Sequence, residues 1–368
     1  MAAVTEKQAP VLIMAGGTGG HIFPALAVAD TIQNEGAPVV WLGTEKGLES
    51  KVIPKEGIDI QYIRISGLRG KGLLHKLAAP FKIVDAIIQA YKIIRRIKPR
   101  AVLGMGGYVT GPGGIAAWIS GTPLYIHEQN AIAGLTNKIL SRIANRVFEA
   151  FPGSFKQMAK LTCSGNPIRK EFFGLQQVEE RFAAREGKLN VLVLGGSLGA
   201  KVLNEVVPEA VSKIEGSVRP NVRHQAGERT INIAKEQYDQ VGVVAEVTTF
   251  IDDMAQSFEW ADIIICRAGA LTVAEIAVVG VPAILVPFPH AVDDHQTQNA
   301  RYLSTAGAAV LMPQERLNAD CLYKEMMKLI QDKKLRIKMA KKAKELAREN
   351  AAEIVAQQCL KNEGLETA

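Results

Sequence analysis

Short apolar runs recur along the chain, each followed by a glycine-rich or polar loop and then by apolar positions at helical spacing. In the first half these runs predict strands at residues 11–14, 39–42, 60–65, 101–103, 124–126 and 146–148. The stretch after the first run predicts a helix over residues 22–35. Strands that alternate with helices are typical of an α/β domain, in which a parallel sheet carries helices on both faces.

The alternation stops between residues 157 and 187, where a Gly-Asn-Pro turn and a charged helix predict a domain boundary. A second series of strands follows at residues 190–194, 222–224, 242–245, 263–266, 283–286 and 308–312. Two helices rich in Lys, Glu and Ala are expected over residues 333–348 and 351–361. We therefore predict one domain over residues 1–165 and a second over residues 166–349.

The starts of the two halves are alike. VLIMAGGTGG at residues 11–20 matches VLVLGGSLGA at residues 191–200, and both read as a strand, a glycine loop and a helix start. This repeat predicts two similar doubly wound, Rossmann-like domains that face each other. A ligand is then expected in the cleft between them, beyond the carboxyl ends of the strands.

Composition narrows the kind of partner. The 368 residues carry a net charge of +7, which favours an anionic partner, and no Lys/Arg block with interleaved aromatics points to nucleic acid. The four cysteines form no CxxC pair, so we expect reduced thiols in a cytoplasmic protein. We expect no signal peptide, and no apolar run reaches the roughly 18 residues of a membrane span. Any membrane contact must then be peripheral.

Three glycine loops follow predicted strands: GGTGGH at residues 16–21, GMGGY at residues 104–108, and GGS at residues 195–197. Glycine lets a ligand approach the backbone, and the following helix N-terminus attracts anions, so diphosphate groups are the expected guests. A dinucleotide fingerprint is excluded because Ile22 and Val109 stand where its third glycine is needed. A P-loop motif is also missing from the sequence.

The segment RAGALTVAE at residues 267–275 follows a predicted strand and opens a helix. Thr272 and Glu275 have the spacing of a capping box, which is one interpretation of the glutamate. The other is that the backbone of residues 269–272 binds diphosphate while the Glu275 carboxylate accepts hydrogen bonds from two ribose hydroxyls. The sequence leaves both open.

Polar residues also follow the strand predicted at 283–286. PFPH at residues 287–290 and DDHQTQN at residues 293–299 supply amide and imidazole groups, which suit the hydroxyls of a sugar. A solvated loop with aspartate caps is the alternative.

These motifs, together with HEQN at residues 127–130 and GNPIR at residues 165–169, occur in one order between residues 11 and 300. In this order they resemble the undecaprenyl-diphospho-muramoylpentapeptide β-N-acetylglucosaminyltransferases, which act in peptidoglycan synthesis. The resemblance implies the α/β fold class GT-B, with two Rossmann-like domains, an interdomain cleft, and a C-terminal helix at residues 350–368 that packs back on the first domain. It implies UDP-N-acetylglucosamine as donor and the lipid-linked muramoyl-pentapeptide as acceptor.

The resemblance also assigns roles to residues. For the donor it implies main-chain recognition of uracil at Ile251, ribose binding by Glu275, and sugar binding by His295 and Gln296. In some members both of the last two positions are Gln. The other implied donor contacts are Asn130, Arg169, Ser197, Ala270, Leu271 and Thr272. Thr18, Gly19 and Gly20, in the first glycine loop, are expected to bind substrate together with the acceptor-diphosphate residues. The acceptor diphosphate is expected on Gly17, Gly106, Gly107 and Tyr108.

The implied reaction is an inverting substitution, in which the acceptor 4-hydroxyl attacks the anomeric carbon and UDP leaves. The base is either His21, in the first glycine loop, or Glu128, which follows another strand. The sequence has no DxD motif, so we expect neither a metal nor a cofactor, and the helix dipoles must stabilise the leaving diphosphate.

A lipid-linked acceptor requires contact with an anionic membrane, at the cytoplasmic face of the inner membrane. Residues 68–81 are the candidate, because Leu73, Leu74, Leu77 and Phe81 alternate there with Lys71 and Lys76, next to Lys82. Trp118 is a further candidate. Residues 83–97 read instead as an amphipathic helix whose apolar face is core.

Three other functions stay open on the sequence. They are a UDP-N-acetylglucosamine 2-epimerase of the same fold, a transferase for another glycolipid, and a sugar-nucleotide-binding subunit without catalysis. Products formed with and without a lipid acceptor distinguish them.

Overall fold

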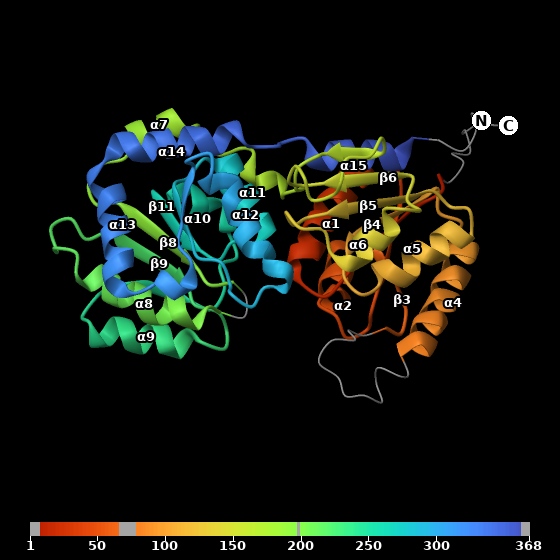
Figure 1. The fold of residues 1–368 in the computed structure, drawn as a ribbon, viewed down its shortest axis with the longest axis horizontal. Coiled ribbons are helices and arrows are strands. Elements are labelled where there is room, and N and C mark those ends of the chain that lie inside the picture. The colour runs from red at the N-terminus through yellow and green to blue at the C-terminus, as the bar shows by residue number, and fades with distance from the viewer. Residues whose placement is uncertain (1–7, 66–78, 197–198, 362–368) are drawn as a thin grey trace, which may run out of the picture. The chain divides into compact units, whose positions relative to one another are not determined.

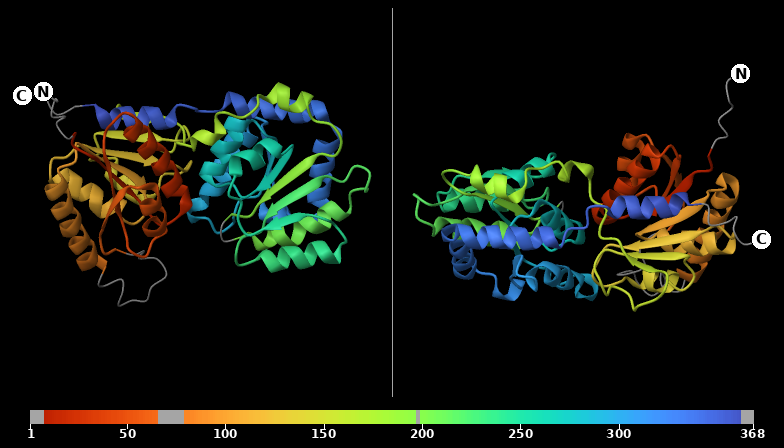
Figure 2. Two further views of the ribbon diagram at one scale, coloured as in Figure 1. Left: turned by 180° about the vertical axis from the view of Figure 1, so that it is seen from behind. Right: turned by 90° about the horizontal axis from the view of Figure 1, so that it is seen from above.

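The structure, a computed structural model, describes residues 8–65, 79–196 and 199–361. The chain forms two compact units, unit 1 (Met1–Arg169 and Glu349–Ala368) and unit 2 (Lys170–Arg348). The sequence predicts these limits at 165/166 and 349/350. Both units contain a parallel sheet with helices on its two faces, as Figures 1 and 2 show, so the α/β, Rossmann-like fold class is confirmed.

Unit 1 is built on a seven-stranded sheet in the order β3-β2-β1-β4-β5-β6-β7. Its strands are β1 (Val11–Ala15), β2 (Val39–Gly43), β3 (Asp59–Tyr62), β4 (Ala101–Gly106), β5 (Leu124–Glu128), β6 (Arg146–Glu149) and β7 (Leu161–Cys163). Its helices are α1 (Gly19–Asn34), α2 (Glu49–Val52), α4 (Ala79–Ile97), α5 (Thr110–Ile119), α6 (Leu135–Leu140) and α15 (Ala351–Leu360), with a 3-10 turn at Ile53–Glu56.

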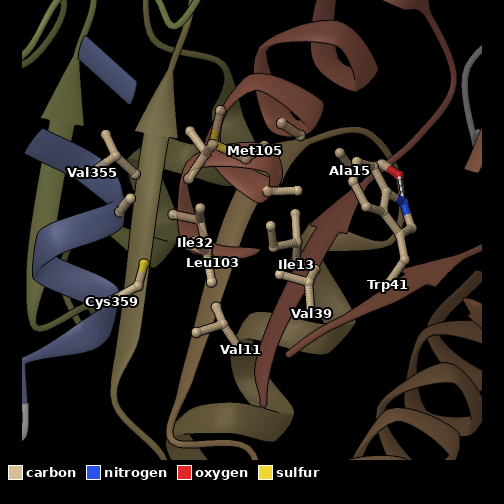
Figure 3. Close-up of a cluster of buried hydrophobic side chains, with 14 of the residues drawn as sticks. Val11, Ile13, Ala15, Ile32, Val39, Trp41, Leu103, Met105, Val355 and Cys359 are labelled. Carbon is tan, nitrogen blue, oxygen red and sulfur yellow. Dashed lines mark hydrogen bonds between the residues drawn. The ribbon is translucent and has the colours of Figure 1, made fainter. Parts of the chain in front are cut away.

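The side chains of β1 alternate between two buried faces. Val11 and Ile13 pack in a core that includes α1 and α15, whereas Leu12 and Met14 pack in a core that includes α4 and α5. Figure 3 shows the first core, in which α15 contributes residues such as Val355. The C-terminal helix therefore forms part of the interior of unit 1.

The sheet of unit 2 has six strands in the order β10-β9-β8-β11-β12-β13. They are β8 (Asn190–Leu194), β9 (Asn221–Gln225), β10 (Glu246–Thr248), β11 (Ile263–Cys266), β12 (Ala283–Leu285) and β13 (Ala309–Leu311). The helices are α7 (Val178–Ala183), α8 (Lys201–Ser212), α9 (Ile231–Gln240), α10 (Met254–Trp260), α11 (Ala270–Val279), α12 (His295–Ser304), α13 (Ala319–Gln331) and α14 (Lys333–Glu345), with 3-10 turns at Lys170–Phe172, Val292–Asp294 and Gln314–Arg316.

Each sheet reverses its strand order at one point, between β1 and β4 in unit 1 and between β8 and β11 in unit 2. Ligands of open α/β sheets bind at such switch points, beyond the carboxyl ends of the strands. The glycine loop after β1 and the loop containing Gly106 and Gly107 lie at the switch point of unit 1. Gly195 and Gly196, which follow β8, and the segment at 267–269 lie at the switch point of unit 2.

Three strand predictions need correction. β7 was not expected, because three residues that pair only with β6 give too short a pattern. The strand expected at 242–245 lies at Glu246–Thr248, because Gly242, at φ +65°, closes the C-terminal turn of α9. β3 ends at Tyr62, three residues earlier than expected.

Candidate functional site

The two glycine loops of unit 1 lie against each other. The N–H of Gly16 donates to the carbonyl of Gly106 (3.3 Å), and a Cβ on Gly107 would lie 2.3 Å from the carbonyl oxygen of Gly16. Gly106 and Gly107 have φ of +107° and +86°, a region that favours glycine. Only glycine therefore allows this close approach of two backbone segments.

Helix α1 begins directly in the first glycine loop. Thr18 precedes it with extended backbone, and Gly19 and Gly20 are its first two residues. The first N–H groups of a helix have no intrahelical acceptor and carry a partial positive charge. Thr18 and Gly20 are exposed here, as is Tyr108 after the second loop, so the helix start can receive an anion such as diphosphate.

His21 lies in the first turn of α1 and is half-buried. Its Nδ1 lies 3.1 Å from Oε1 of the buried Gln129, which follows β5. A Cβ on Gly106 would come within 2.4 Å of the same Nδ1, so the glycine provides the space in which the ring lies. Both glycine loops and the HEQN segment therefore meet at this imidazole.

The Glu128 carboxylate, the other candidate base, is occupied by its own loop. It is buried and accepts hydrogen bonds from the N–H groups of Asn130 and Gly134 (3.0 Å each) and from Nδ2 of Asn137 (2.9 Å). The Asn130 side chain also donates to it, at 3.3 Å. This carboxylate therefore orders residues 130–137.

His127 is fully buried beside it. Its Nε2 lies 2.9 Å from the carbonyl of Gly165, and burial lowers the pKa of His127 to about 4. Nδ2 of Asn166 donates to the carbonyl of Gln129 (3.0 Å), so the GNPIR segment is bound to the end of β5. Arg169, the last residue of this segment, has its guanidinium 5.7 Å from the ring centroid of Phe23 on α1.

Glu49 was missed by the sequence analysis. Its buried carboxylate accepts from the N–H of Gly17 (3.0 Å) and from the N–H and hydroxyl of Thr44 (2.9 and 2.8 Å). The Gly17 N–H, expected to contact the acceptor diphosphate, therefore bonds to Glu49 in this structure. No local motif marks Glu49, because its partner in the glycine loop is 32 residues away.

In unit 2 the segment after β11 starts a helix, as expected. Helix α11 begins at Ala270 with Gly269 as its N-cap, so the capping box of Thr272 and Glu275 is wrong. The first-turn N–H groups belong instead to Ala270, Leu271 and Thr272, in a geometry that suits diphosphate. The Glu275 side chain lies one turn further on and is buried.

Arg267 connects three loops at the carboxyl edge of this sheet. Its guanidinium donates to the carbonyls of Val286 and Pro287 (3.2 and 3.1 Å) and to Oε1 of Gln314 (2.7 Å). Burial lowers the pKa of Arg267. The Phe288 ring lies 5.4 Å from the guanidinium, so the arginine also positions the PFPH segment.

The polar loop before α12 has an unusual backbone. Asp293 and Asp294 have φ of +54° and +52°, and the hydroxyl of Thr297 donates to Asp294 Oδ1 (2.6 Å). His295 and Gln296 begin α12, and Oε1 of Gln296 accepts from the N–H of Phe288 (2.9 Å). Strained residues of this kind cluster at functional sites.

Two predicted donor contacts of unit 2 remain, Ile251 and Ser197. Ile251 is half-buried in the loop before α10, next to the exposed Phe250. Ser197 lies outside the described residues. Among the residues that the structure describes, no group of three His, Cys, Asp or Glu side chains has a metal-binding arrangement.

A second surface of unit 1 lies on α4 and α5, which pack together in Figure 1. Ala86, Ala90 and Ile94 of α4 are buried, as expected for an amphipathic helix. However, Val84 and Ile88 are 55% and 48% exposed, so the apolar residues after position 81 are not all core. Phe81 and, on α5, Trp118 are 79% and 57% exposed. Leu73, Leu74, Leu77, Lys71 and Lys76 lie outside the described residues. No helix in the described part of the chain has the length and apolarity of a membrane span.

Comparison with known proteins gives consistent matches. The family model described as the glycosyltransferase family 28 N-terminal domain matches residues 11–149, and the family 28 C-terminal domain matches residues 190–354. A protein of Marinobacter nauticus named UDP-N-acetylglucosamine–N-acetylmuramyl-(pentapeptide) pyrophosphoryl-undecaprenol N-acetylglucosamine transferase is 53% identical over 95% of this chain and 96% of its own. One of the same name from Alkalilimnicola ehrlichii is 54% identical over 95% of this chain and 98% of its own.

Solved structures resemble this chain either in both sequence and fold or in fold alone. The crystal structure of Acinetobacter baumannii MurG has a TM-score of 0.83 and 43% identity, and covers 95% of this chain and 99% of its own. A UDP-N-acetylglucosamine 2-epimerase has a TM-score of 0.66 at 15% identity, over 96% of each chain. The second likeness is one of fold alone.

Proposed function

This chain belongs to glycosyltransferase family 28, and from that premise we propose that it transfers N-acetylglucosamine from UDP-N-acetylglucosamine to the lipid-linked muramoyl-pentapeptide. The identity of more than half of all aligned positions with transferases of that name supports this function most strongly. The product is the disaccharide-pentapeptide lipid of peptidoglycan synthesis, and through it the enzyme serves cell shape and division.

The donor binds unit 2 in this proposal. The N-terminus of α11 holds the diphosphate through Ala270, Leu271 and Thr272, and the buried Glu275 accepts the ribose hydroxyls. Ile251 reads uracil through its main chain, and His295 and Gln296 bind the sugar. Ser197, Asn130 and Arg169 stay predictions as further donor contacts.

The acceptor binds unit 1, with its diphosphate at the start of α1 and beside Gly106, Gly107 and Tyr108. His21 takes the proton of the 4-hydroxyl as this oxygen attacks the anomeric carbon. Glu128 is the weaker candidate for the base, because its carboxylate is buried and its oxygens already accept four hydrogen bonds from its own loop. As UDP leaves, the first-turn N–H groups of α11 stabilise the negative charge that develops on the diphosphate.

The α4–α5 surface contacts an anionic membrane at its cytoplasmic face in this proposal. Phe81, Val84, Ile88 and Trp118 supply exposed apolar side chains, and Lys82 is exposed beside them. Vesicles with anionic lipid should bind the protein, and a Phe81→Ser, Val84→Ser double variant should bind them more weakly. Equal binding by the variant would exclude this surface.

The test of the reaction is product analysis with labelled UDP-N-acetylglucosamine. We expect label in the lipid fraction only when the muramoyl-pentapeptide lipid is present. A free N-acetylmannosamine nucleotide formed without any acceptor would identify an epimerase instead.

His21→Ala should lower turnover about 100-fold or more while UDP still binds, because general base catalysis contributes at least about that factor. Unchanged turnover would exclude His21 as the base.

A further inference from the structure

The side chain of Gln129 joins the imidazole of His21 to an irregular point of the sheet. The register between β1 and β4 steps from Met14 opposite Gly104 to Ala15 opposite Gly106, and so passes over Met105. A residue passed over in this way is left unpaired in the ladder. Nε2 of Gln129 donates to the carbonyl of Met105 at 2.8 Å.

That bond fixes which end of the amide faces the histidine. With Nε2 directed at a carbonyl oxygen, Oε1 must face Nδ1 of His21, and it does so at 3.1 Å. A flipped amide would bring two oxygens together at Met105 and lose a hydrogen bond inside the protein. Gln129 is only 2% exposed, and its own carbonyl accepts from Asn166, so both ends of the residue are held.

An amide oxygen can only accept, so Nδ1 of His21 must carry the hydrogen of this bond. We propose that Gln129 is a positioning residue that holds neutral His21 in the Nδ1–H tautomer, with the Nε2 lone pair directed to the reacting hydroxyl. This inference rests on the proposed role of His21 as base. Gly106 completes the arrangement, because a side chain there would occupy the space of the ring.

The orienting group here is an uncharged amide. In hydrolase triads a carboxylate has this place, and it stabilises the imidazolium as well as the tautomer. An amide selects the tautomer through its oxygen but adds no full charge. Gln129 therefore acts chiefly on the geometry and tautomer of the neutral base.

Nitrogen-15 NMR of the imidazole rings tests the tautomer directly. The chain has six histidines, and the signal lost in His21→Gln identifies His21. In the unmodified protein at neutral or higher pH we expect the hydrogen on Nδ1, and in Gln129→Leu a shift toward Nε2–H. Hydrogen on Nε2 in the unmodified protein, or an unchanged tautomer in Gln129→Leu, would overturn the proposal.

Kinetics provide the second measurement. Gln129→Leu should lower kcat about 10-fold to 100-fold, the range known for removal of the partner that orients a metal-bound histidine, with little change in the KM for UDP-N-acetylglucosamine. Gln129→Met, which keeps the length of the side chain, should behave alike. The control is Gln33→Leu, an exposed position on the same helix as His21, which should change neither readout. A rise in KM alone would contradict the positioning role.

The two proposals fail in different ways. If His21→Ala keeps its turnover while the NMR shows the Nδ1–H tautomer, the assignment of the base is wrong and the orientation of the ring by Gln129 stands. If His21→Ala is inactive and the NMR shows Nε2–H, the base stands and the role of Gln129 is wrong.

Discussion

Unit 1 and unit 2 place their candidate site loops at the same point of similar sheets, but different side chains hold these loops. In unit 1 the buried Glu49 carboxylate and the Gln129 amide bind the glycine loop and His21. In unit 2 the Arg267 guanidinium binds the segments after β12 and β13. A cation beside a helix start adds to the attraction for diphosphate, whereas the neutral and acidic groups of unit 1 chiefly fix geometry. The contrast supports the proposed donor site in unit 2 and the proposed base in unit 1.

The largest expected effect tests the backbone contact in unit 1. Gly107→Ala should lower the free energy of unfolding by about 3 kcal/mol or more, because it adds strain at φ +86° to a clash with the Gly16 backbone. Gly36→Ala is the matched control, with φ of +82° but no atom near the added carbon, and should lose only about 1 kcal/mol. Urea unfolding measures both. Equal losses would show that the contact between the two loops contributes nothing.

The next effect tests the cation of unit 2. Arg267→Ala should lower the free energy of unfolding by about 2–3 kcal/mol, because it leaves the Val286 and Pro287 carbonyls without this donor. It should also raise the KM for UDP-N-acetylglucosamine about 10-fold, the effect of about 1.4 kcal/mol of lost binding. Arg301→Ala, an exposed arginine on α12, should change neither. An unchanged KM in Arg267→Ala would show that this arginine does not contribute to donor binding.

Among the residues that the structure describes, each unit has one deeply buried histidine, which makes the stability of the unit depend on pH. Burial lowers the pKa of His127 to about 4 and that of His224 to about 3, below about 6.5 for an exposed histidine. Below pH 6.5 the unfolded chain therefore binds protons that the folded units exclude, and stability falls as the pH falls. The loss should be about 2 kcal/mol per histidine at pH 5 relative to pH 8.

Urea unfolding at pH 8 and pH 5 tests this for the two units separately. His127→Gln and His224→Gln should each remove about one such increment from the pH dependence, although both variants are less stable at pH 8. A variant with the same difference between the two pH values as the unmodified protein would refute the effect for its unit.

The smallest effect concerns the acidic side chain of unit 1. Glu49→Gln should lower the free energy of unfolding by about 1–2 kcal/mol, because its NH₂ group would face a donor where the carboxylate accepts three hydrogen bonds. The expected turnover loss is smaller than for Gln129→Leu, since Glu49 acts on the loop and not on His21. Turnover lower than that of Gln129→Leu would reverse this ranking.

The strands were the most predictable part of the fold. The runs predicted at Asn190–Leu194 and Ile263–Cys266 coincide with β8 and β11, because both strands are buried on two faces and, apart from Asn190, consist of apolar residues. The short β7 and the displaced β10 lacked that signal. The sequence could not decide between the two interpretations of the segment at 267–275, because Gly269, which caps α11, has no side-chain signature of a cap.

The residues of the candidate site could be predicted from local motifs, but the contacts between them could not. Glycine loops and a histidine at a helix start can be read from local sequence. The partners of these groups cannot, because Gln129 is 108 residues from His21 and Glu49 is 32 residues from Gly17. Such pairs exist only after the sheet has brought β1, β2 and β5 into order.

Because of helix α15, the core of unit 1 can be completed only at the end of synthesis. Its residues Val355, Ala356 and Cys359 belong to the core around α1, yet the ribosome makes them after all of unit 2. Domains generally fold as they emerge from the ribosome, the N-terminal one first. The core of unit 1, however, lacks the side chains of α15 until unit 2 has been translated. A nascent chain stalled before residue 351 should therefore expose the apolar surface of α1 to chaperones and proteases, even though the sheet beneath it is complete.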